Sequence, residues 1–384
     1  MKFLHLSDLH IGKSVNGFSM LEEQRHAFEQ IITYIKTERP NAVIIAGDVY
    51  DRTVPGVEAV RLFDDFLTEL SKTSVSVLLI SGNHDSPERL NYASRLLSDK
   101  NIFMRGAFDG ALQKVVLNDE YGEVNFWLLP FIKPAYLHGM FDGRKIESYG
   151  DAVTAVIETA DIDYSLRNVL VSHQFFTKAG LTPFRSDSEL NPVGGLDAID
   201  CTLIDNFDYV ALGHLHKAQK IGDEHIRYAG SPVKYSFSEL WHEKSFTVVE
   251  LKEKGGINIA AVPLEPLHNM REIKGELEQL ISDEVSSLAD KNDYLRVILT
   301  DEEEIIDPMG KIRGVYPNVM TIDFENSRTS VDISEITANL KHTEQLTPCD
   351  LFGEFFLDLN GSAMSEEQEK IIRDIFDEKT EDEQ

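Results

Sequence analysis

Polar side chains that could bind a metal follow the ends of apolar runs in the first part of this chain. The run VSVLLI leads into SGNHDS, which places Asn83, His84 and Asp85 side by side. The same arrangement recurs after other apolar runs, at Asp8, His10, Asp48, Asp51, His173, His214 and His216. Carboxylate, amide and imidazole groups form a mixed ligand set, which suits Mn, Fe or Zn better than the all-oxygen shells of Ca or Mg. The residue types therefore predict a metal site.

The number of candidate ligands points to two ions. A lone histidine at a strand end is usually structural, but five of the 12 histidines fall at such ends beside carboxylates and an amide. Roughly seven protein ligands are too many for one ion, and a carboxylate can bridge two. The spacings Asp-x-His and His-x-His put two ligands on one side of a strand end. We expect a two-metal site, which clamps a phosphate while water attacks in line.

The elements between these residues predict a layered α/β fold with mixed sheets flanked by helices. The apolar runs KFLHL, AVIIAG, VSVLLI and NVLVSH are continuous, as in strands buried on both faces. A helix is expected over 20–35, with one face made of Leu21, Phe28, Ile31, Ile32 and Ile35. Another is expected over 57–70, with a face made of Val57, Val60, Phe63, Leu67 and Leu70. Ligands of such folds sit at the carboxyl ends of strands, where the candidates lie.

The pattern of expected strands and helices changes near residue 265. We therefore expect domains at 1–265, 266–345 and 346–384. DYLRVILTD, DPMGKIRGVYPN and VMTIDFEN predict a strand, a helix and a strand in a small α+β unit. A helix then begins with Thr347 as N-cap and Pro348 in the first turn, and Gly361 ends it. A second helix opens with the capping box SEEQ at 365–368.

Composition limits the classes of function. The net charge of -29 argues against a nucleic-acid binder, although TDEEEIID and DEKTEDEQ concentrate the acid in the last third of the 384 residues. The two cysteines are far apart in sequence and support neither a disulfide framework nor a cysteine metal site. No apolar run is long enough to span a bilayer, and no signal peptide is recognisable at the start, so we expect a cytoplasmic protein.

The order of the motifs resembles the calcineurin-like metallophosphoesterases. These motifs are Asp-x-His, Gly-Asp-x-x-Asp, Gly-Asn-His-Asp, a later Ser-His and Gly-His-x-His. The resemblance implies that one ion is held by Asp8, His10, Asp48 and His216, and the other by Asp48, Asn83, His173 and His214. It leaves His84 off the metals, facing the substrate phosphate, where an imidazole can donate a proton at neutral pH. Asp51 and Asp85 would orient neighbouring groups.

Further stretches are similar to the nuclease subunits of SbcCD complexes. HLSDLHIGK, GDVYDRTVP and above all IRYAGSPVKYSFSE carry this resemblance. It implies a Mn-dependent nuclease with ATP-dependent double-strand exonuclease and single-strand or hairpin endonuclease activity, in DNA end processing, repair and recombination. It also implies an ATPase partner, SbcC, and a homodimer within a heterotetramer. Residues 266–345 would cap and position DNA, and the helices from 346 would dock on the partner near the base of its coiled coil.

Several alternatives remain open from the sequence. The metals could serve a nucleotide or another small phosphoester, or the chain could be a scaffold without catalysis, and the last helices could simply pack on their own domain. An apolar face near 57–70 or 88–97 is a candidate dimer surface, and the contacts of the loop 177–195 are open. Basic residues near the motifs could form a rim for DNA, although each is more often a solvated charge: Lys13, Arg52, Arg89, Lys178, Arg185 and Lys217.

Overall fold

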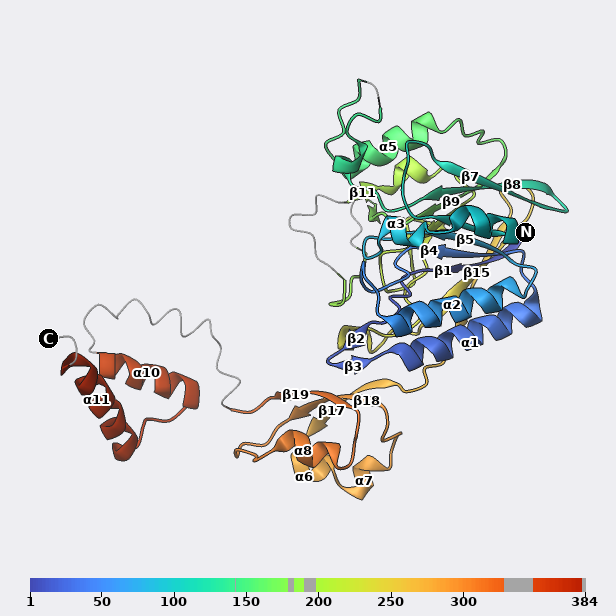
Figure 1. Cartoon of the computed structure of the whole chain (residues 1–384). Helices are drawn as coiled ribbons and strands as arrows, with labels where there is room; N and C mark the ends of the chain where they lie inside the picture. Colours follow the sequence, from blue (N-terminus) through green and yellow to red (C-terminus); the bar gives the residue numbers. More distant parts are fainter. Residues whose placement is uncertain (142, 179–182, 190–197, 328–347, 382–384) are drawn as a thin grey trace. The chain divides into compact units, whose positions relative to one another are not determined.

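The chain forms two compact units, Met1–Asn269 and Met270–Gln384. The computed structural model describes residues 1–141, 143–178, 183–189, 198–327 and 348–381 (Figure 1). In these described ranges every helix is too short or too polar to cross a membrane.

The first unit contains two six-stranded mixed sheets. The first sheet has the order β16 (Ile257–Pro263), β15 (Ser245–Leu251), β1 (Lys2–Leu6), β4 (Ala42–Ala46), β5 (Ser76–Ile80) and β6 (Ile102–Arg105). The second has the order β13 (Gln219–Ile221), β14 (Asp223–Tyr228), β12 (Tyr209–Leu212), β9 (Arg167–Ser172), β8 (Gly122–Leu129) and β7 (Gln113–Asp119). Four neighbouring strands of each sheet run parallel, and each strand outside these four pairs antiparallel with its neighbours.

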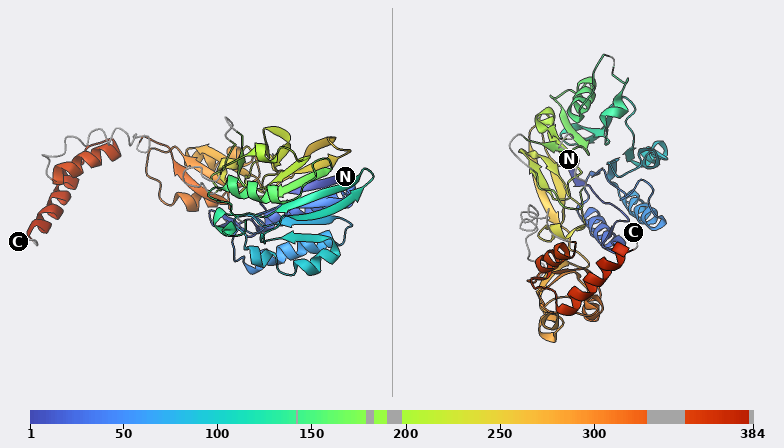
Figure 2. Two further views of the ribbon diagram at one scale, coloured as in Figure 1. Left: turned by 90° about the horizontal axis from the view of Figure 1, so that it is seen from above. Right: turned by 90° about the vertical axis from the view of Figure 1, so that its left-hand side faces the viewer.

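The two sheets face each other across an apolar core. Phe3 and Ile44 from the first sheet belong to one buried cluster with Phe126, Val169 and Tyr209 from the second. The helices α1 (Leu21–Glu38) and α2 (Val57–Ser71) lie on one side of this pair of sheets, and α5 (Tyr149–Thr159) lies on the other (Figures 1 and 2). The predicted layered α/β fold with mixed sheets is confirmed. Continuous burial along β4 and β9 explains why these strands lack alternation.

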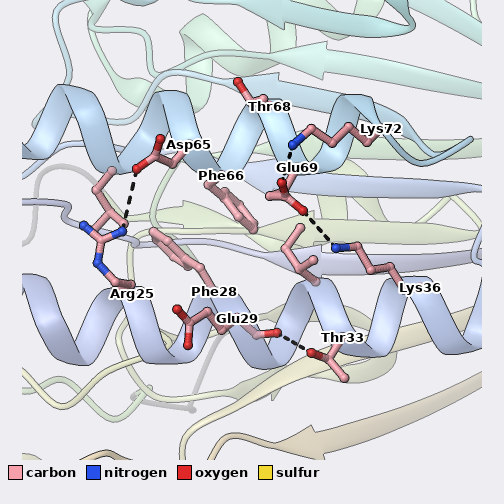
Figure 3. A pocket seen from close by; sticks show the side chains of 12 residues that line it. Arg25, Phe28, Glu29, Thr33, Lys36, Asp65, Phe66, Thr68, Glu69 and Lys72 are labelled. Carbon is pink, nitrogen blue, oxygen red and sulfur yellow. Dashed lines mark hydrogen bonds and ion pairs between the residues drawn. The ribbon is translucent and has the colours of Figure 1, made fainter.

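Helices α1 and α2 pack side by side. Phe28 and Phe66 stack with their ring centroids 4.4 Å apart. Figure 3 shows these rings turned toward each other, with ion pairs bridging the rim of the groove between the helices. Lys36 Nζ lies 2.8 Å from a Glu69 carboxylate oxygen. Both helices are therefore held along their length, which fixes the loops at their ends.

The buried face predicted for α2 was partly wrong. Val57 and Val60 are 66% and 45% exposed, whereas the residues buried on α2 are Ala59, Leu62, Phe63, Phe66 and Leu70. Two overlapping apolar stripes exist on this helix, and contact with α1 selects the one that contains Phe66. The other stripe is left on the surface.

Short elements complete the first unit. They are β2 (Ser14–Val15), β3 (Phe18–Ser19), α3 (Pro87–Leu90), α4 (Ser94–Leu97), β10 (Phe176–Thr177), β11 (Ile199–Asp200) and the 3-10 turns Ser98–Lys100, Pro134–Leu137, Cys201–Ile204 and Phe237–Glu239. The carboxyl ends of the central strands are level with each other: Ala46 pairs with Ile80, and Leu212 pairs with Ser172. The loops after these strands therefore start at the same edge.

The second unit begins with a three-stranded parallel sheet. Its order is β17 (Met270–Gly275), β18 (Tyr294–Leu299) and β19 (Val319–Phe324). The helices α6 (Leu277–Leu280), α7 (Asp283–Ser286) and α8 (Pro308–Arg313) connect the strands. The predicted strand, helix and strand are β18, α8 and β19. The elements β17, α6 and α7 were not predicted, because they are short and carry weak patterns.

Two helices, α10 (Pro348–Asn360) and α11 (Glu366–Glu381), follow. They pack through aromatic side chains, with the Phe352 and Phe376 ring centroids 6.5 Å apart. Gly361 has a φ of 63° at the end of α10, and the Ser365 backbone N–H donates to Gln368 Oε1 at 2.9 Å at the start of α11. The predicted C-cap and capping box are confirmed. Thr347, the predicted N-cap, lies outside the described residues.

Candidate metal centre

All seven predicted ligands meet where the two sheets end. Asp8, Asp48 and Asn83 follow β1, β4 and β5 of the first sheet, as does His10, and the other three histidines follow β9 and β12 of the second. Four of the seven have a left-handed backbone, which is uncommon outside glycine: φ is 51° at Asp8, 42° at His10, 50° at Asp48 and 104° at His214. Backbone strain of this kind concentrates at functional sites.

One group of donor atoms surrounds the ring nitrogens of His10 and His216. Their Nε2 atoms lie 3.1 Å apart, and His10 Nε2 lies 3.6 Å from Asp48 Oδ2. Asp8, His10 and His216 each offer an atom within 4.8 Å of the others, and all three are buried. Burial lowers the pKa of the His10 imidazole well below its usual value. A neutral imidazole with a free lone pair is the form that binds metals.

A second group of donor atoms surrounds His173. Its Nε2 lies 3.2 Å from Asn83 Oδ1 and 3.2 Å from Asp48 Oδ2. His214 Nδ1 lies 3.1 Å from the same Asn83 oxygen. The Nδ1–H of His173 donates to the Ala46 carbonyl at 2.7 Å, which directs Nε2 into the site. Four donors from four strand ends therefore converge a second time.

The Asp48 carboxylate lies between the two groups of donors. Its Oδ2 is within 3.6 Å of His10 and 3.2 Å of His173. Burial alone would raise the pKa of the Asp48 carboxyl. The imidazoles of His173, His10 and His84 nevertheless hold this pKa well below its usual range. Burial likewise lowers the pKa of His173, yet Asp48 and Asp8 raise it to about 9. The site is thus built around negative charge.

The donor set fits divalent cations. Asp8 and Asp48 are 0% and 2% exposed, and in the described parts of the chain their ion pairs are with histidines and not with Lys or Arg. Two buried carboxylates this close to each other need positive charge to offset the cost of burial. Cations held by these oxygens and by the imidazole nitrogens would supply it.

Glycines before the candidate ligands make room for them. A Cβ on Gly82 would lie 2.1 Å from Asp48 Oδ1, and one on Gly213 would lie 2.0 Å from the Ala46 carbonyl oxygen. Neither position can accept a side chain without moving the site. The Gly-Asn and Gly-His pairs of the sequence are therefore packing requirements of the ligand next to each glycine.

His84 lies at the edge of the site and is half-buried. Its backbone N–H donates to Asp48 Oδ1 at 2.9 Å, and its Nδ1 donates to the carbonyl of Asp51 at 3.0 Å. This leaves its Nε2 without a partner among these contacts, and the ring stands edge-on to His10 with 4.8 Å between centroids. By distance alone, His84 can also form a cluster with His10 and Asp48.

Asp85 and Asp51 contact the loops around the ligands. Asp85 is 3% exposed, and its carboxylate accepts from the backbone N–H groups of Val49, Tyr50 and Gly82 at 2.9 to 3.1 Å. It therefore joins the loop of Asp48 to the loop of Asn83. Asp51 Oδ1 lies 3.7 Å from His10 Nδ1 and 2.9 Å from Lys13 Nζ.

Comparisons with known proteins identify the family of the chain. The model of the calcineurin-like phosphoesterases matches residues 1–218, and that of the type 5 capsule protein repressor C-terminal domain matches residues 266–358. The SbcD component of the nuclease SbcCD from Staphylococcus epidermidis is 32% identical over 382 residues, which cover 98% of each chain. The chain belongs to the SbcD family of calcineurin-like phosphoesterases.

Two solved structures resemble part of this SbcD-family chain. A phosphopantetheinyl hydrolase from Mycobacterium tuberculosis is 14% identical, with 62% of this chain and 91% of that one covered and a TM-score of 0.39. A dimetal phosphatase from Danio rerio is 13% identical, with 69% and 97% covered and a TM-score of 0.40. The family and the donor cluster together support a phosphoester hydrolase that uses divalent metals.

Sequence reasoning missed a side chain that supports His10 in this SbcD-family chain. Gln24 on α1 is fully buried, its Nε2 donates to the His10 carbonyl at 2.8 Å, and its Oε1 accepts from the Gly12 N–H at 3.1 Å. Its Nε2 also lies 2.9 Å from the hydroxyl of Tyr235, which donates to the Leu9 carbonyl. The signal was present, because Gln24 falls in the apolar stripe of 20–35, where a polar residue needs a partner.

The basic residues predicted for the rim have varied surroundings. Lys13 and Arg52 both pair with Asp51, at 2.9 and 3.6 Å. Arg185 lies over the Phe175 ring at 3.8 Å, and Lys217 lies over a second aromatic ring at 4.6 Å. Of the remaining two, Lys178 pairs with an aspartate at 3.5 Å, and Arg89 is exposed. Lys13 is therefore largely neutralised by its neighbour.

Proposed function

We propose that this chain is a two-metal DNA nuclease, the catalytic subunit of an SbcCD-type complex. Its ligand groups are Asp8, His10, Asp48 and His216 for one ion, and Asp48, Asn83, His173 and His214 for the other. The observation that carries the proposal is the position of Asp48, whose Oδ2 lies within reach of both His10 and His173. Ions held by these residues would supply Lewis acidity and a water nucleophile for phosphodiester cleavage.

The protein's own groups do the remaining chemistry. His84 keeps its Nδ1–H on the Asp51 carbonyl, which turns Nε2 away from that contact, and in the doubly protonated ring the Nε2–H can donate a proton to the oxygen that leaves the phosphate. The partial exposure of His84, in contrast to buried His10 and His173, supports a role toward substrate. Asp51 and Asp85 keep the loops of the site in place.

The mixed carboxylate and imidazole ligand set supports a transition-metal ion over Mg²⁺, and we propose that this ion is Mn²⁺. Imidazole and carboxylate together favour transition metals over Mg²⁺, which prefers oxygen ligands and retains several waters. Four of the seven ligand side chains contribute imidazole nitrogens: His10, His173, His214 and His216.

Both units supply proposed contacts with partners. Residues 266–345 would cap the site and position DNA, and residues 346–384 would dock on the ATPase partner, SbcC. The outer faces of α10 and α11 support the docking role, because Phe355 and Ile375 are 51% and 48% exposed. Val57, Tyr92 and Leu96, which are 66%, 82% and 75% exposed, would lie in a homodimer contact within a heterotetramer.

The test is a nuclease assay on a defined DNA hairpin and a duplex end, with Mn²⁺ or Mg²⁺, with and without the co-expressed ATPase partner and ATP. We expect Mn²⁺-dependent cleavage of the hairpin, and duplex degradation that requires the partner and ATP. An Asp48→Asn variant purified in the same way controls for contaminating nucleases. Hydrolysis of mononucleotides without any cleavage of DNA would overturn the proposal in favour of a small-substrate phosphoesterase.

The net charge of the chain leads to a separate prediction about its affinity for DNA. With a net charge of -29, the isolated chain should bind duplex DNA weakly at physiological salt, and the partner should supply most phosphate contacts. Fluorescence anisotropy with and without the partner measures this. Tight binding by the isolated chain would contradict it.

A further inference from the structure

The backbone of His216 is held on both sides by buried charged side chains. Lys244 Nζ donates to the His216 carbonyl at 2.9 Å, and Glu189 Oε1 accepts from the His216 N–H at 2.8 Å. Lys244 and Glu189 are 8% and 7% exposed. The main chain of this candidate ligand therefore has little freedom to move.

The ring of His216 is held by a chain of two further side chains. Ser188 Oγ lies 2.7 Å from His216 Nδ1 and 2.7 Å from Glu239 Oε1. Because a carboxylate only accepts, the Ser188 hydroxyl donates to Glu239 and accepts from the Nδ1–H of His216. The proton of the neutral ring is thereby kept on Nδ1. The lone pair is left on Nε2, which lies 3.1 Å from His10 Nε2 in the metal site.

Glu239 carries its charge in a fully enclosed position. It is 0% exposed, and its Oε2 lies 2.6 Å from Lys244 Nζ. Lys244 also donates to Ser231 Oγ at 2.8 Å. A buried ion pair adds little net stability compared with apolar side chains of the same volume, so its presence directly behind a candidate ligand favours a role in positioning that ligand.

The other donor group has no such support at His173 within the described residues. His173 is oriented through the Ala46 carbonyl, which is a neutral backbone group, at 2.7 Å. A carboxylate behind a metal-binding imidazole orients the ring and raises its basicity, and loss of such a partner commonly weakens metal affinity about 10- to 100-fold. The two proposed ions therefore differ in what stands behind their histidines.

We propose that Glu239, which is paired with Lys244 and linked to the His216 ring through Ser188, positions His216 for one metal ion. The other metal ion, at His173, does not depend on Glu239. This inference rests on the two-metal site of the proposed function. It also gives a role to Glu239, the last residue of the stretch IRYAGSPVKYSFSE.

The test counts Mn²⁺ ions on the metal-stripped full chain by isothermal titration and by electron paramagnetic resonance of free Mn²⁺. For Glu239→Gln we expect the dissociation constant of one ion to rise about 10- to 100-fold, while that of the other stays at the wild-type value. Glu23→Gln is the matched control, because Glu23 is 4% exposed and accepts from the backbone N–H of Leu267 at 3.0 Å, away from the site. It should bind both ions as the wild type does.

Two more variants keep the test decisive if Glu239→Gln does not fold with an unpaired Lys244. Glu239→Gln combined with Lys244→Met removes both charges, and Ser188→Ala breaks the bridge while the ion pair stays. The double variant should lose one ion selectively. Ser188→Ala should show a smaller loss, because Glu239 Oε1 lies 3.4 Å from His216 Nδ1 and can still attract it.

The outcomes separate this inference from the proposed function. Wild-type affinity for both ions in every folded variant, or equal weakening of both ions, would overturn the positioning role alone. A wild-type chain that binds fewer than two ions would overturn the two-metal site itself. Two bound ions without any DNA cleavage would refute the nuclease and leave the positioning role standing.

Discussion

The metal centre and the C-terminal helical pair expose their side chains in opposite ways. Asp8 and Asp48 are 0% and 2% exposed although both are acids, whereas Phe355 and Ile375 are 51% and 48% exposed although both are apolar. Each region therefore departs from the usual rule of polar outside and apolar inside, in opposite directions. Both departures cost free energy in the isolated chain, which a bound cation would offset in the first region and a partner protein would offset in the second.

The two regions differ in which contacts position their side chains. In the metal centre, strand ends, glycines and buried partners such as Gln24 position the donor side chains. In the helical pair, Phe352 packs against Phe376 on the inner face, and the apolar side chains of the outer face remain exposed. Substitutions in the first region should therefore act on metal and chemistry, and those in the second on assembly.

The largest effect is expected from Gly82→Ala. The added Cβ would lie 2.1 Å from Asp48 Oδ1 and 2.4 Å from the Asp48 backbone nitrogen, so the shared carboxylate must move. We expect nuclease activity at background and fewer than two bound Mn²⁺ ions by titration. Gly150→Ala on α5 is the control, because its Cβ would approach Ser148 Oγ only to 3.7 Å. Wild-type cleavage by Gly82→Ala would show that the site can accept the added Cβ without losing its geometry, and would contradict this prediction.

The next effect is that of His84→Ala. Loss of a proton donor typically lowers the rate about 10²- to 10⁴-fold, and both ions should remain because His84 is not among their proposed ligands. Single-turnover cleavage of hairpin DNA and Mn²⁺ titration measure the two quantities on the same preparation. Loss of an ion together with activity would make His84 a ligand, as its cluster with His10 and Asp48 allows. His138→Ala, at an exposed histidine, should change neither quantity.

The grouping of the candidate ligands could be predicted because their residue types alone identify them as possible metal ligands. A histidine or aspartate after a buried strand is recognisable without coordinates, and parallel strands bring such positions to one edge. The reason given from strand alternation was incomplete, however. β1 ends at Leu6, so Asp8 and His10 lie beyond it, and their positive φ angles come from tertiary contacts that no local pattern reports.

Other features could not be predicted because two solutions fit the same residues. On α2, Val57 and Phe66 belong to different apolar stripes, and only packing against Phe28 decides which stripe is buried. The buried partners Gln24 and Glu239 are ordinary polar residues in sequence. Their roles depend on neighbours that are distant along the chain.

The helical pair gives the third prediction. Phe355→Gln with Ile375→Gln should weaken binding to the ATPase partner by at least about 30-fold, because an exposed apolar anchor that becomes buried in an interface contributes about 2 kcal/mol or more. Mn²⁺ binding should be unchanged. Lys370→Gln, at an exposed position of α11, is the control. Pull-down and surface plasmon resonance with the partner measure the affinity, and an unchanged value would favour helices that only pack on their own domain.

The smallest effect is expected at the start of α11. Ser365→Ala removes the acceptor for the Gln368 N–H, which now bonds Ser365 Oγ at 3.3 Å, at a cost of about 1 kcal/mol in the first turn. Hydrogen exchange of that turn should quicken, with Ser362→Ala as an uncapped control. Because the contact between Phe352 and Phe376 remains, partner affinity should fall by no more than about 5-fold, which corresponds to the energy of the cap. A larger loss of partner affinity would mean that the partner contacts the first turn of α11 as well as the apolar face.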